Sequence, residues 1–324
     1  MRAYVLKDNK PTFSFEDVNL PVLKKDEVIV NLDAAAMNHR DVWISKGMYA
    51  GLKYPIILGS DGAGWLDGEE VIINPGQGWG ENGSFHGKDF KILGLPENGT
   101  FAQQVITDKK YVYPKPGHLT MEQAAALPLA GLTAYRALFS RGRLQRGDKL
   151  LISGIGGGVA LMTLKLGVAA GAEVFVTSSD SEIIDKAIEI GARGGFLYTE
   201  DNWSKPAYKE TGGIDLIIDG AGGKGFSELI NVCNTGGRIV NYGGSAGMIE
   251  GIVPQKVFWK HLSILGSTMG SDSDFEQMIT FVNRYEIIPV IDTVFELGVA
   301  DQGFERMESG RQFGKIVFSI PSII

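Results

Sequence analysis

The sequence predicts an α/β protein with two domains, one β-rich and antiparallel or barrel-like, the other built on a doubly wound parallel sheet. The length of 324 residues suits two domains of ordinary size. Up to about Thr120, short β-rich segments alternate with turns. From there to about Glu286, short apolar segments alternate with helical patterns, which is typical of parallel strands joined by crossover helices.

The first part of the chain consists of short segments with partial alternation of apolar and polar residues. Proline residues and a glycine-rich stretch, residues 74–84, separate these segments. Short strands divided in this way are typical of an antiparallel or barrel-like domain. The strands that we expect are Arg2–Lys7, Glu27–Ala35 and Glu70–Asn74.

A helix is expected after Thr120, because a threonine followed three residues later by Gln123 is the pattern of a capping box. A last helix starts near Asp272 and Asp274 and carries its apolar residues on one face. The tail from residue 287 to 324 returns to a strand-like pattern and is expected to rejoin the first domain. Between these helices, six segments are expected to form the parallel sheet: Lys149–Ser153, Glu173–Thr177, Gly195–Tyr198, Asp215–Asp219, Arg238–Tyr242 and Leu262–Gly266.

The charge distribution excludes several functional classes. The net charge is −7 and the pI is near 5.3, which argues against a nucleic-acid partner because phosphate contacts need basic clusters. The longest stretch without a charged residue, Leu150–Leu164, is too short to span a bilayer, and the N-terminus has no apolar signal region. We therefore expect a soluble cytoplasmic protein that acts on a small molecule, with no nucleic acid and no membrane among its partners.

Cysteine occurs once, at Cys233. A single cysteine excludes an intramolecular disulfide framework and any zinc site built from two or four cysteines. The four histidines form no spaced pair, so a histidine-rich metal site is not expected either.

The strongest chemical signal is a glycine cluster between the apolar segment Leu150–Ser153 and a helical pattern. Backbone amides at a helix N-terminus bind a pyrophosphate, and glycine lets the phosphate approach the main chain. The regular Gly-x-Gly-x-x-Gly spacing is not met, and in the best register Gly157 and Gly158 form the turn of close approach. The alternative is a tight turn without a ligand, although four glycines within five positions exceed what a turn requires. The candidate cofactor-binding residues of this turn are Gly156, Gly157, Gly158 and Val159.

The residues at the end of the expected strand Glu173–Thr177 should decide between NADH and NADPH. NAD-binding sites usually carry Asp or Glu there, whereas this chain carries Ser178 and Ser179. Hydroxyl groups can donate to a 2′-phosphate that a carboxylate would repel. Asp180 leaves an alternative open, because a shift of one residue would restore a site for NADH. The sequence thus favours NADPH, with NADH possible.

Six motifs then follow one another along the chain, each weak alone and specific in this order. They are Ala36-Met-Asn-His-Arg-Asp41, Leu58-Gly-Ser-Asp-Gly-Ala-Gly64, Leu127-Pro-Leu-Ala-Gly-Leu-Thr-Ala-Tyr135, Gly237-Arg-Ile-Val-Asn-Tyr-Gly243, Ser263-Ile-Leu-Gly-Ser-Thr-Met-Gly270 and Phe313-Gly-Lys-Ile-Val-Phe318. Through them the chain resembles the medium-chain dehydrogenase/reductase superfamily, especially its zinc-free quinone oxidoreductase-like branch, with members labelled zinc-type alcohol dehydrogenase-like. The resemblance covers essentially the whole length. It implies a GroES-like substrate domain at residues 1–122 and 287–324, a Rossmann cofactor domain at 123–286, and a homodimer.

The resemblance also bears on zinc. Zinc alcohol dehydrogenases of this superfamily hold the catalytic metal with Cys, His and Cys beside a Glu, and a structural zinc with four close cysteines. No cysteine lies between residues 74 and 100 here. Leucine cannot ligate zinc, and amides and hydroxyls are poor ligands, so the resemblance implies a protein without zinc. The positions that match the catalytic set hold Asn38, Ser60, Leu129 and Asp61.

Without the metal, the implied reaction changes. Alcohol oxidation needs a Lewis acid, whereas hydride addition to a quinone or to an α,β-unsaturated carbonyl can proceed with hydrogen bonding alone. The resemblance therefore implies an NADPH-dependent oxidoreductase that reduces quinones or α,β-unsaturated carbonyl compounds. The alternatives are an alcohol dehydrogenase or carbonyl reductase, and an NADPH-binding protein without catalysis.

The resemblance assigns roles to single residues. Tyr49 matches a tyrosine that related enoyl-thioester reductases use as proton donor or oxyanion partner, or else it lines the cleft. Asn38 is the second catalytic candidate and could orient a substrate carbonyl, or else its amide caps a loop. Many relatives carry a lysine for the 2′-phosphate where this chain has Ile183, and Lys186 lies one helical turn further, which weakens the preference for NADPH. The implied cofactor-binding residues are Thr133, Ser178, Ser179, Tyr198, Asn241, Gly243 and Lys315, the last reaching toward the cofactor phosphates.

Overall fold

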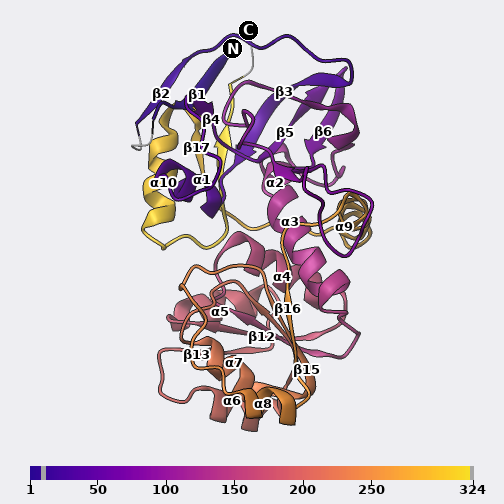
Figure 1. The fold of residues 1–324 in the computed structure, drawn as a ribbon, viewed down its shortest axis with the longest axis vertical. Helices are drawn as coiled ribbons and strands as arrows, with labels where there is room; N and C mark the ends of the chain where they lie inside the picture. The colour runs from indigo at the N-terminus through magenta and orange to yellow at the C-terminus, as the bar shows by residue number, and fades with distance from the viewer. Residues whose placement is uncertain (9–11, 322–324) are drawn as a thin grey trace. The chain divides into compact units, whose positions relative to one another are not determined.

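The computed structural model describes residues 1–8 and 12–321, which form two compact units (Figure 1). The first, called here the β-rich unit, comprises Met1–Ala130 and the residues from Gly270 onward. The second, called here the parallel-sheet unit, comprises Gly131–Met269. Helix α3 (Pro128–Tyr135) runs through the first boundary. Within the described residues, no helix combines the length and the apolar character needed to cross a membrane.

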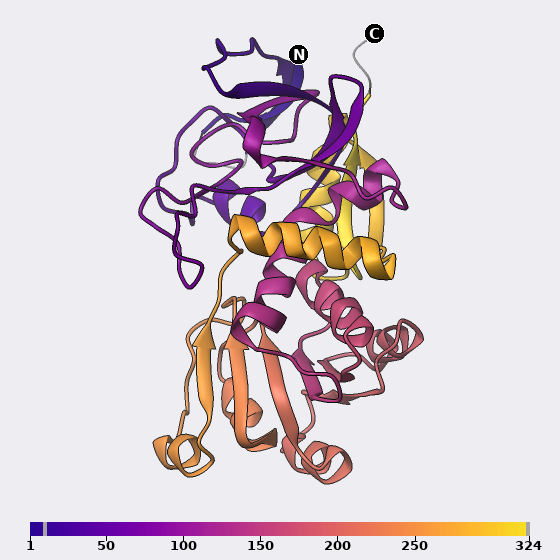
Figure 2. The same ribbon diagram turned by 90° about the vertical axis from the view of Figure 1, so that its right-hand side faces the viewer.

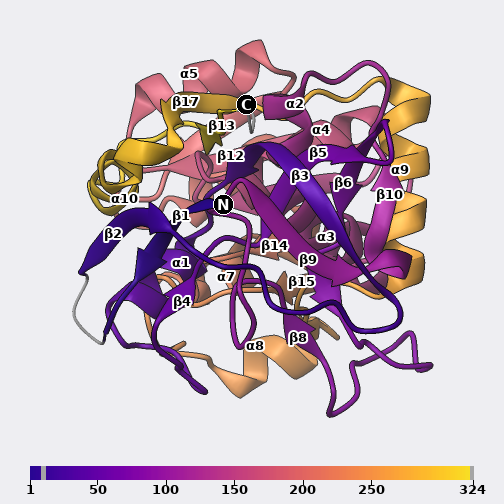
Figure 3. The ribbon, with the colours of Figure 1, turned by 90° about the horizontal axis from the view of Figure 1, so that it is seen from above.

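The three strands predicted for the β-rich unit are present, each within one residue of its expected bounds. Strand β3 (Glu27–Ala36) is the longest of them, and it pairs with three neighbours (Figure 3). The tail returns to this unit as two strands of the same sheet, as the sequence predicts. The strand orders are β2-β1-β4, β10-β6-β5-β3-β18-β17 with β9 beside β3, and β7-β8. The remaining bounds are β1 Arg2–Leu6, β2 Phe13–Asp17, β4 Ile56–Ile57, β5 Asp61–Leu66, β6 Glu69–Ile73, β7 Gly76–Gln77, β8 Lys91–Ile92, β9 Gln104–Asp108, β10 Val112–Pro114, β17 Ile291–Glu296 and β18 Lys315–Ser319.

The helices of the β-rich unit are short except for one. The capping box predicted at Thr120 is confirmed, because the Gln123 N–H donates to Thr120 Oγ1 at 3.3 Å and the Thr120 N–H donates to Gln123 Oε1 at 3.0 Å. A helix in the tail, α10, was not predicted from the strand-like pattern there. The bounds are α1 His39–Ser45, α2 Met121–Ala125, α9 Asp272–Tyr285 and α10 Ala300–Glu308.

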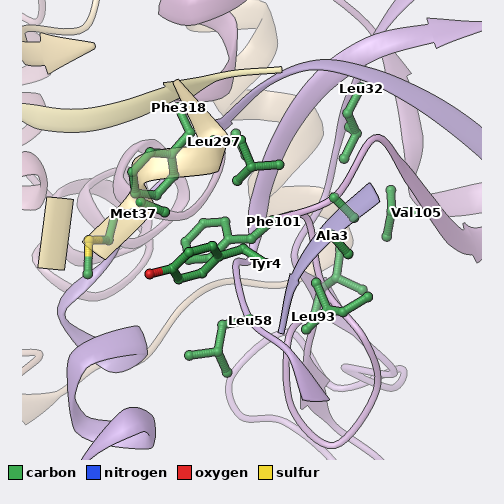
Figure 4. Packing of buried hydrophobic residues seen from close by; sticks show 14 of the residues in the cluster. Ala3, Tyr4, Leu32, Met37, Leu58, Leu93, Phe101, Val105, Leu297 and Phe318 are labelled. Carbon is green, nitrogen blue, oxygen red and sulfur yellow. The ribbon is translucent and has the colours of Figure 1, made fainter. Parts of the chain in front are cut away.

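Apolar side chains from both ends of the chain form the core of the β-rich unit (Figure 4). Tyr4 and Leu58 are buried in it, and the rings of Phe101 and Phe318 meet edge to face with their centres 5.0 Å apart. Burying a side chain of this size stabilises a fold by roughly 1.5–3 kcal/mol. Because Met37 and Phe318 both belong to this core, it fixes the end of β3 beside strand β18.

The parallel-sheet unit is a doubly wound sheet, as the sequence predicts. Its strand order is β13-β12-β11-β14-β15-β16, and every pair is parallel (Figure 2). The order reverses between β11 and β14, and ligands of such sheets bind beyond the carboxyl ends of the strands at this point. The strands are β11 Lys149–Ser153, β12 Glu173–Ser178, β13 Gly194–Leu197, β14 Ile214–Asp219, β15 Cys233–Asn241 and β16 Ser263–Gly266; the helices are α4 Gly158–Ala169, α5 Ser181–Glu189, α6 Ser204–Thr211, α7 Phe226–Val232 and α8 Pro254–Trp259.

The boundaries between the units differ from the predicted ones. The sequence suggests a cofactor domain at 123–286, whereas the compact unit spans 131–269. The main reason is helix α9, which belongs to the β-rich unit: its Phe275 ring lies 4.9 Å from the ring of Tyr113, centre to centre. In addition, Asn74 Nδ2 donates to Asp272 Oδ1 at 3.4 Å.

Candidate functional site

The predicted glycine turn follows strand β11 and ends at the start of helix α4. Gly154 and Gly156 adopt positive φ angles of 66° and 136°, which favour glycine. The Gly154 N–H donates to Thr177 Oγ1 at 3.0 Å, and this contact ties the turn to the end of β12. Helix α4 begins at Gly158, with Gly157 as its N-cap and Val159 in its first turn.

Space at this turn is open on the side where a side chain would stand. A Cβ added to Gly154 or Gly157 would meet nothing within 4 Å. Gly157 has an ordinary φ of −77°, so the backbone there does not demand glycine. Absence of a side chain at such a position leaves the main chain open to a ligand, and the N–H groups of a helix N-terminus favour an anion. The turn therefore fits a dinucleotide pyrophosphate.

The end of strand β12 carries hydroxyl groups. Ser178 is the last strand residue, and its Oγ accepts from the Asp180 N–H at 3.2 Å. Asp180 itself caps helix α5, because its Oδ1 accepts from the Glu182 N–H at 2.9 Å. The Tyr198 N–H donates to the Ser178 carbonyl oxygen at 3.0 Å, so these two predicted residues are neighbours. The carboxylate that would favour NADH is thus a helix cap, and the strand end presents serine.

Asp219, which the sequence analysis missed, organises the loop after strand β14. It is 1% exposed and accepts hydrogen bonds from Ser153 Oγ and from Asn241 Nδ2, the latter at 2.8 Å. The N–H groups of Ala221 and Gly222 also donate to it, at 3.2 and 3.0 Å. A carboxylate at a strand end before a glycine-rich loop was the available signal. It holds the ends of β11, β14 and β15 together at the sheet's crevice.

The other predicted cofactor residues of this unit are placed as follows. Asn241 Nδ2 also donates to the Gly243 carbonyl oxygen at 2.8 Å. Thr133 is buried in helix α3, where its hydroxyl lies 3.9 Å from Met269 Sδ. Ser179 is exposed next to Ser178. Their contacts with a cofactor stay predictions.

In the β-rich unit, Asn38, Asp61 and Lys315 meet at the ends of three neighbouring strands. Strand β3 ends at Ala36, which pairs with Asp61 at the start of β5 and with Val317 of β18. The Lys315 ammonium donates to Asn38 Oδ1 at 2.6 Å and to Asp61 Oδ2 at 2.8 Å. Asn38 Nδ2 donates to the same Asp61 oxygen at 2.9 Å. We call these three residues the Lys315 cluster.

The Lys315 cluster is almost closed to solvent: Asp61 is 0%, Lys315 3% and Asn38 8% exposed. Buried charges are costly unless they are paired and hydrogen-bonded, as they are here. The family resemblance implies that Lys315 reaches the cofactor phosphates. The structure places its ammonium on Asp61 and Asn38, so a phosphate contact would have to break this ion pair.

Two further buried charged residues, Arg40 and Asp41, are neighbours in helix α1. Arg40 donates through Nη1 to Ser60 Oγ at 2.7 Å and to the Leu93 carbonyl oxygen at 2.9 Å, while its buried Nε has no partner among the described residues. Burial raises the pKa of the Asp41 carboxyl to about 6, although Arg40 and the hydrogen bond from the Asn38 N–H act in the opposite direction. Sequence reasoning gave no role to Arg40.

Tyr49 lies half-buried against the core of the β-rich unit. The guanidinium carbon of Arg40 lies 5.4 Å from the centre of its ring, within cation–π range. Asn38 caps helix α1 through its backbone and belongs to the Lys315 cluster through its side chain. Arg40 therefore connects the surroundings of the two predicted catalytic residues, since it follows Asn38 closely in the chain and contacts Tyr49.

The residues at the family's catalytic zinc position do not fit a zinc ion. Asn38 and Asp61 are engaged by the Lys315 ammonium, whose positive charge would repel a metal cation. Ser60 Oγ donates to the Leu93 carbonyl oxygen at 2.8 Å, and Leu129 offers only its N–H, which donates to Asp61 Oδ1 at 2.8 Å. Among residues 1–8 and 12–321, no three His, Cys, Asp or Glu side chains gather in a metal-binding arrangement.

Comparison with known proteins gives two family matches. A model described as alcohol dehydrogenase GroES-like domain matches residues 24–117, and one described as zinc-binding dehydrogenase matches residues 158–284. The chain is 34% identical to the zinc-type alcohol dehydrogenase-like protein YogA of Leptosphaeria maculans, over 94% of this chain and 93% of that protein. It is 28% identical to the acryloyl-coenzyme A reductase of Sulfurisphaera tokodaii, with 98% and 99% coverage, and 28% identical to the quinone oxidoreductase of Rattus norvegicus, with 93% and 91% coverage.

Solved structures resemble the chain over nearly its whole length. A structure described as an NAD-dependent alcohol dehydrogenase has a TM-score of 0.94 and 34% identity, and covers 99% of this chain and 100% of its own. The quinone oxidoreductase of Thermus thermophilus, solved also in complex with NADPH, has a TM-score of 0.83 and 25% identity, with 98% and 100% coverage. Both likenesses extend over a GroES-like and a Rossmann-type part, as the observed fold does.

Proposed function

This chain belongs to the medium-chain dehydrogenase/reductase superfamily, and from this premise we propose that it is an NADPH-dependent reductase of quinones or α,β-unsaturated carbonyl compounds that works without zinc. One observation carries the proposal. The same chain has an open pyrophosphate cradle at Gly154–Gly158 and, at the family's zinc position, an ion pair of Lys315 with Asp61. A cofactor site is retained while the metal's ligands are replaced.

When bound, NADPH supplies the hydride. Addition of the hydride to the β-carbon of an enone moves the π electrons onto the carbonyl oxygen, and a proton then adds to the α-carbon. A quinone likewise gains one hydride and one proton. Because the acceptor spreads the incoming charge onto oxygen, hydrogen-bond donors can take the place of a Lewis acid. The protein's main tasks are to hold the reactants close and to exclude water.

We assign these tasks to individual residues. The turn at Gly156–Val159 holds the pyrophosphate, and Asn241 and Gly243 line the crevice after strand β15. Asn38 donates to the substrate's carbonyl oxygen, and Tyr49 donates the proton to the carbanion or the oxygen. Thr133 contacts the cofactor near the nicotinamide.

NADPH is preferred over NADH in this proposal. The hydroxyls of Ser178 and Ser179 can donate to the 2′-phosphate, and Tyr198 lies next to Ser178. A carboxylate that bound the ribose would repel the 2′-phosphate. The Asp180 carboxylate does not have this role, because it caps helix α5. The NADPH-bound quinone oxidoreductase from Thermus thermophilus supports the same preference.

The test is oxidation of NADPH, with NADH in parallel, against quinones, enones and trans-2-enoyl thioesters. We expect turnover with at least one of these classes and a higher kcat/KM with NADPH. No turnover with any of them would overturn the proposal. In the same preparation, light scattering measures the molar mass, for which we propose a homodimer.

The alternative is reversible oxidation of an alcohol with NAD. It is favoured by the 34% identity to the structure described as an NAD-dependent alcohol dehydrogenase. Metal analysis together with alcohol oxidation separates the two: one catalytic zinc per chain and turnover of alcohols would establish the alternative.

A further inference from the structure

We propose that Lys315 and Asp61 are positioning residues that fix the side-chain amide of Asn38 as a hydrogen-bond donor toward the substrate's carbonyl oxygen. The identity of that acceptor rests on the proposed function. The orientation of the amide rests on the Lys315 cluster alone.

The Asn38 amide can take only one orientation between its two partners. An ammonium group only donates hydrogen bonds, and a carboxylate only accepts them. The amide oxygen lies 2.6 Å from the Lys315 ammonium, and the amide nitrogen lies 2.9 Å from Asp61 Oδ2. A flipped amide would set donor against donor and oxygen against oxygen, which costs both hydrogen bonds.

This orientation decides what the amide can offer. Its nitrogen carries two N–H groups, and Asp61 accepts one of them. The second N–H has no partner in the part of the chain that the structure describes, and Asn38 keeps 8% exposure. The oxygen is directed to Lys315. Asn38 therefore presents a donor, which is what a carbonyl oxygen that gains negative charge requires.

The two partners of Asn38 are themselves held in place. Asp61 Oδ1 accepts from the Leu129 N–H at 2.8 Å, and the Asp61 carbonyl oxygen accepts from Thr100 Oγ1 at 2.8 Å. Lys315 starts strand β18, and the Ile316 carbonyl oxygen next to it accepts from the Met37 N–H at 2.9 Å. Since the cluster is buried, these contacts act at low dielectric and the donor is set before substrate arrives.

The test replaces the cluster without leaving a buried lone charge. Lys315→Met alone would leave the buried Asp61 carboxylate without its cation. The variant is therefore Lys315→Met with Asp61→Asn, in which the Asn38 amide can flip. The matched control is Lys115→Met with Glu70→Gln, another ion pair of the β-rich unit with a lysine side chain 4% exposed. A further variant, Asn38→Leu, removes the amide without adding a charge beside Asp61.

We expect kcat for enone reduction to fall by about 10-fold in the cluster variant and by at least about 100-fold in Asn38→Leu, the usual effect of losing one oxyanion donor. The KM for NADPH stays within about twofold of the control, because the lost interaction arises in the transition state. A kcat of the cluster variant equal to that of the control would overturn the proposal.

A second readout separates this proposal from the proposed function. In protein with ¹⁵N-labelled asparagine, the Asn38 side-chain N–H signals are those missing from Asn38→Leu. They should shift in the cluster variant and stay in place in the Lys115 control. Unshifted signals would refute the fixed amide whatever the substrate, whereas shifted signals in a wild-type protein that reduces none of the substrates would refute the proposed function and the acceptor while the positioning of the amide stands.

Discussion

The guanidinium carbon of Arg40 lies 5.4 Å from the centre of the Tyr49 ring, so a buried cation contacts the side chain that we propose as proton donor. Arg40 is held from its other side by Ser60 and by the Leu93 carbonyl oxygen. Arg40 thus contacts the ring of Tyr49 and not its hydroxyl, so the hydroxyl can be removed without loss of this contact.

Tyr49→Phe should therefore reduce activity selectively. The ring contact with Arg40 remains, but the proton donor is lost, and general acids of this kind contribute about 10²-fold or more. We expect kcat/KM to fall much more for enones than for quinones, whose reduced oxygens take protons readily from water. Steady-state kinetics with one enone and one quinone check this, and an equal loss for both would refute the acid role.

Gly157→Ala should weaken NADPH binding without unfolding the protein. Gly157 has an ordinary φ and open space around its Cβ position, so alanine fits the fold, but its methyl group would stand where the pyrophosphate approaches the main chain. We expect the Kd for NADPH, measured by fluorescence titration, to rise by at least about 10-fold.

The control for Gly157→Ala is Gly225→Ala. Gly225 is also a helix N-cap with a negative φ and open space, but it precedes helix α7 and not the predicted turn. Its Kd for NADPH should stay near the wild-type value. Equal affinities of the two variants would contradict a cradle at Gly157.

Asp41 should make the fold less stable as the pH rises through weakly acidic values. Its carboxyl has a pKa of about 6 in the fold, against an ordinary pKa of 3.8, so between these values the folded chain binds the extra proton and unfolding becomes easier as pH increases. The full effect is on the order of 3 kcal/mol. The measurement is urea unfolding between pH 4 and pH 7, for the wild type and for Asp41→Asn. The wild type's free energy of unfolding should fall relative to the variant's.

Asp292 is a control, because its effect on the free energy of unfolding should change with pH in the opposite direction. Burial acts to raise the pKa of its carboxyl, but hydrogen bonds from Arg306 and from the Phe313 N–H outweigh this and lower it. Its stabilising contribution is present above the ordinary aspartate pKa of 3.8 and is lost as the pH falls through the lowered pKa. Relative to Asp292→Asn, the wild type should therefore gain stability with rising pH in the acid range. The same sign for both aspartates would contradict the burial argument for Asp41.

Tyr54→Phe should leave the stability unchanged or raise it by up to about 1 kcal/mol, because the Tyr54 hydroxyl is buried without a hydrogen-bond partner among the described residues. Tyr111→Phe is the matched comparison. The Tyr111 hydroxyl accepts from the Gly78 N–H at 2.7 Å. Its removal leaves this N–H without that acceptor and should lower the free energy of unfolding by about 1–2 kcal/mol. Thermal unfolding of both variants checks the difference, and a larger loss for Tyr54→Phe would contradict it.

The parts of the fold that the sequence predicts correctly are those with local signals. Strand β11, the glycine turn and helix α4 are continuous in the chain. Four of the six strands of the parallel sheet, β11, β12, β14 and β15, contain a run of apolar residues. The capping box at Thr120 lies within four residues. Ser178 could be proposed in the same way, because it ends the strand that follows the glycine turn, whereas Tyr198 was proposed only through the family resemblance.

The parts that it does not predict depend on contacts between distant segments. The apolar face of helix α9 was visible, but periodicity does not say that Phe275 would lie against Tyr113. Asp219 could be read from the sequence as an ordinary helix cap, and only the pairing of β14 with β11 and β15 brings Ser153 and Asn241 to it. The partners of Lys315 lie 254 and 277 residues away, and no spacing rule reaches that far.

The β-rich unit is assembled from two stretches of chain with the whole parallel-sheet unit between them. A ribosome completes residues 131–269 before it has made strand β18, so the parallel-sheet unit can fold first. The ion pair of Asp61 with Lys315 can form only later, after Lys315 has been made. Until then the nascent β-rich unit would hold a carboxylate without its cation, which disfavours closing its core early. Strand β18 therefore controls when the β-rich unit becomes stable, because the Lys315 cluster is complete only after Lys315 has been made.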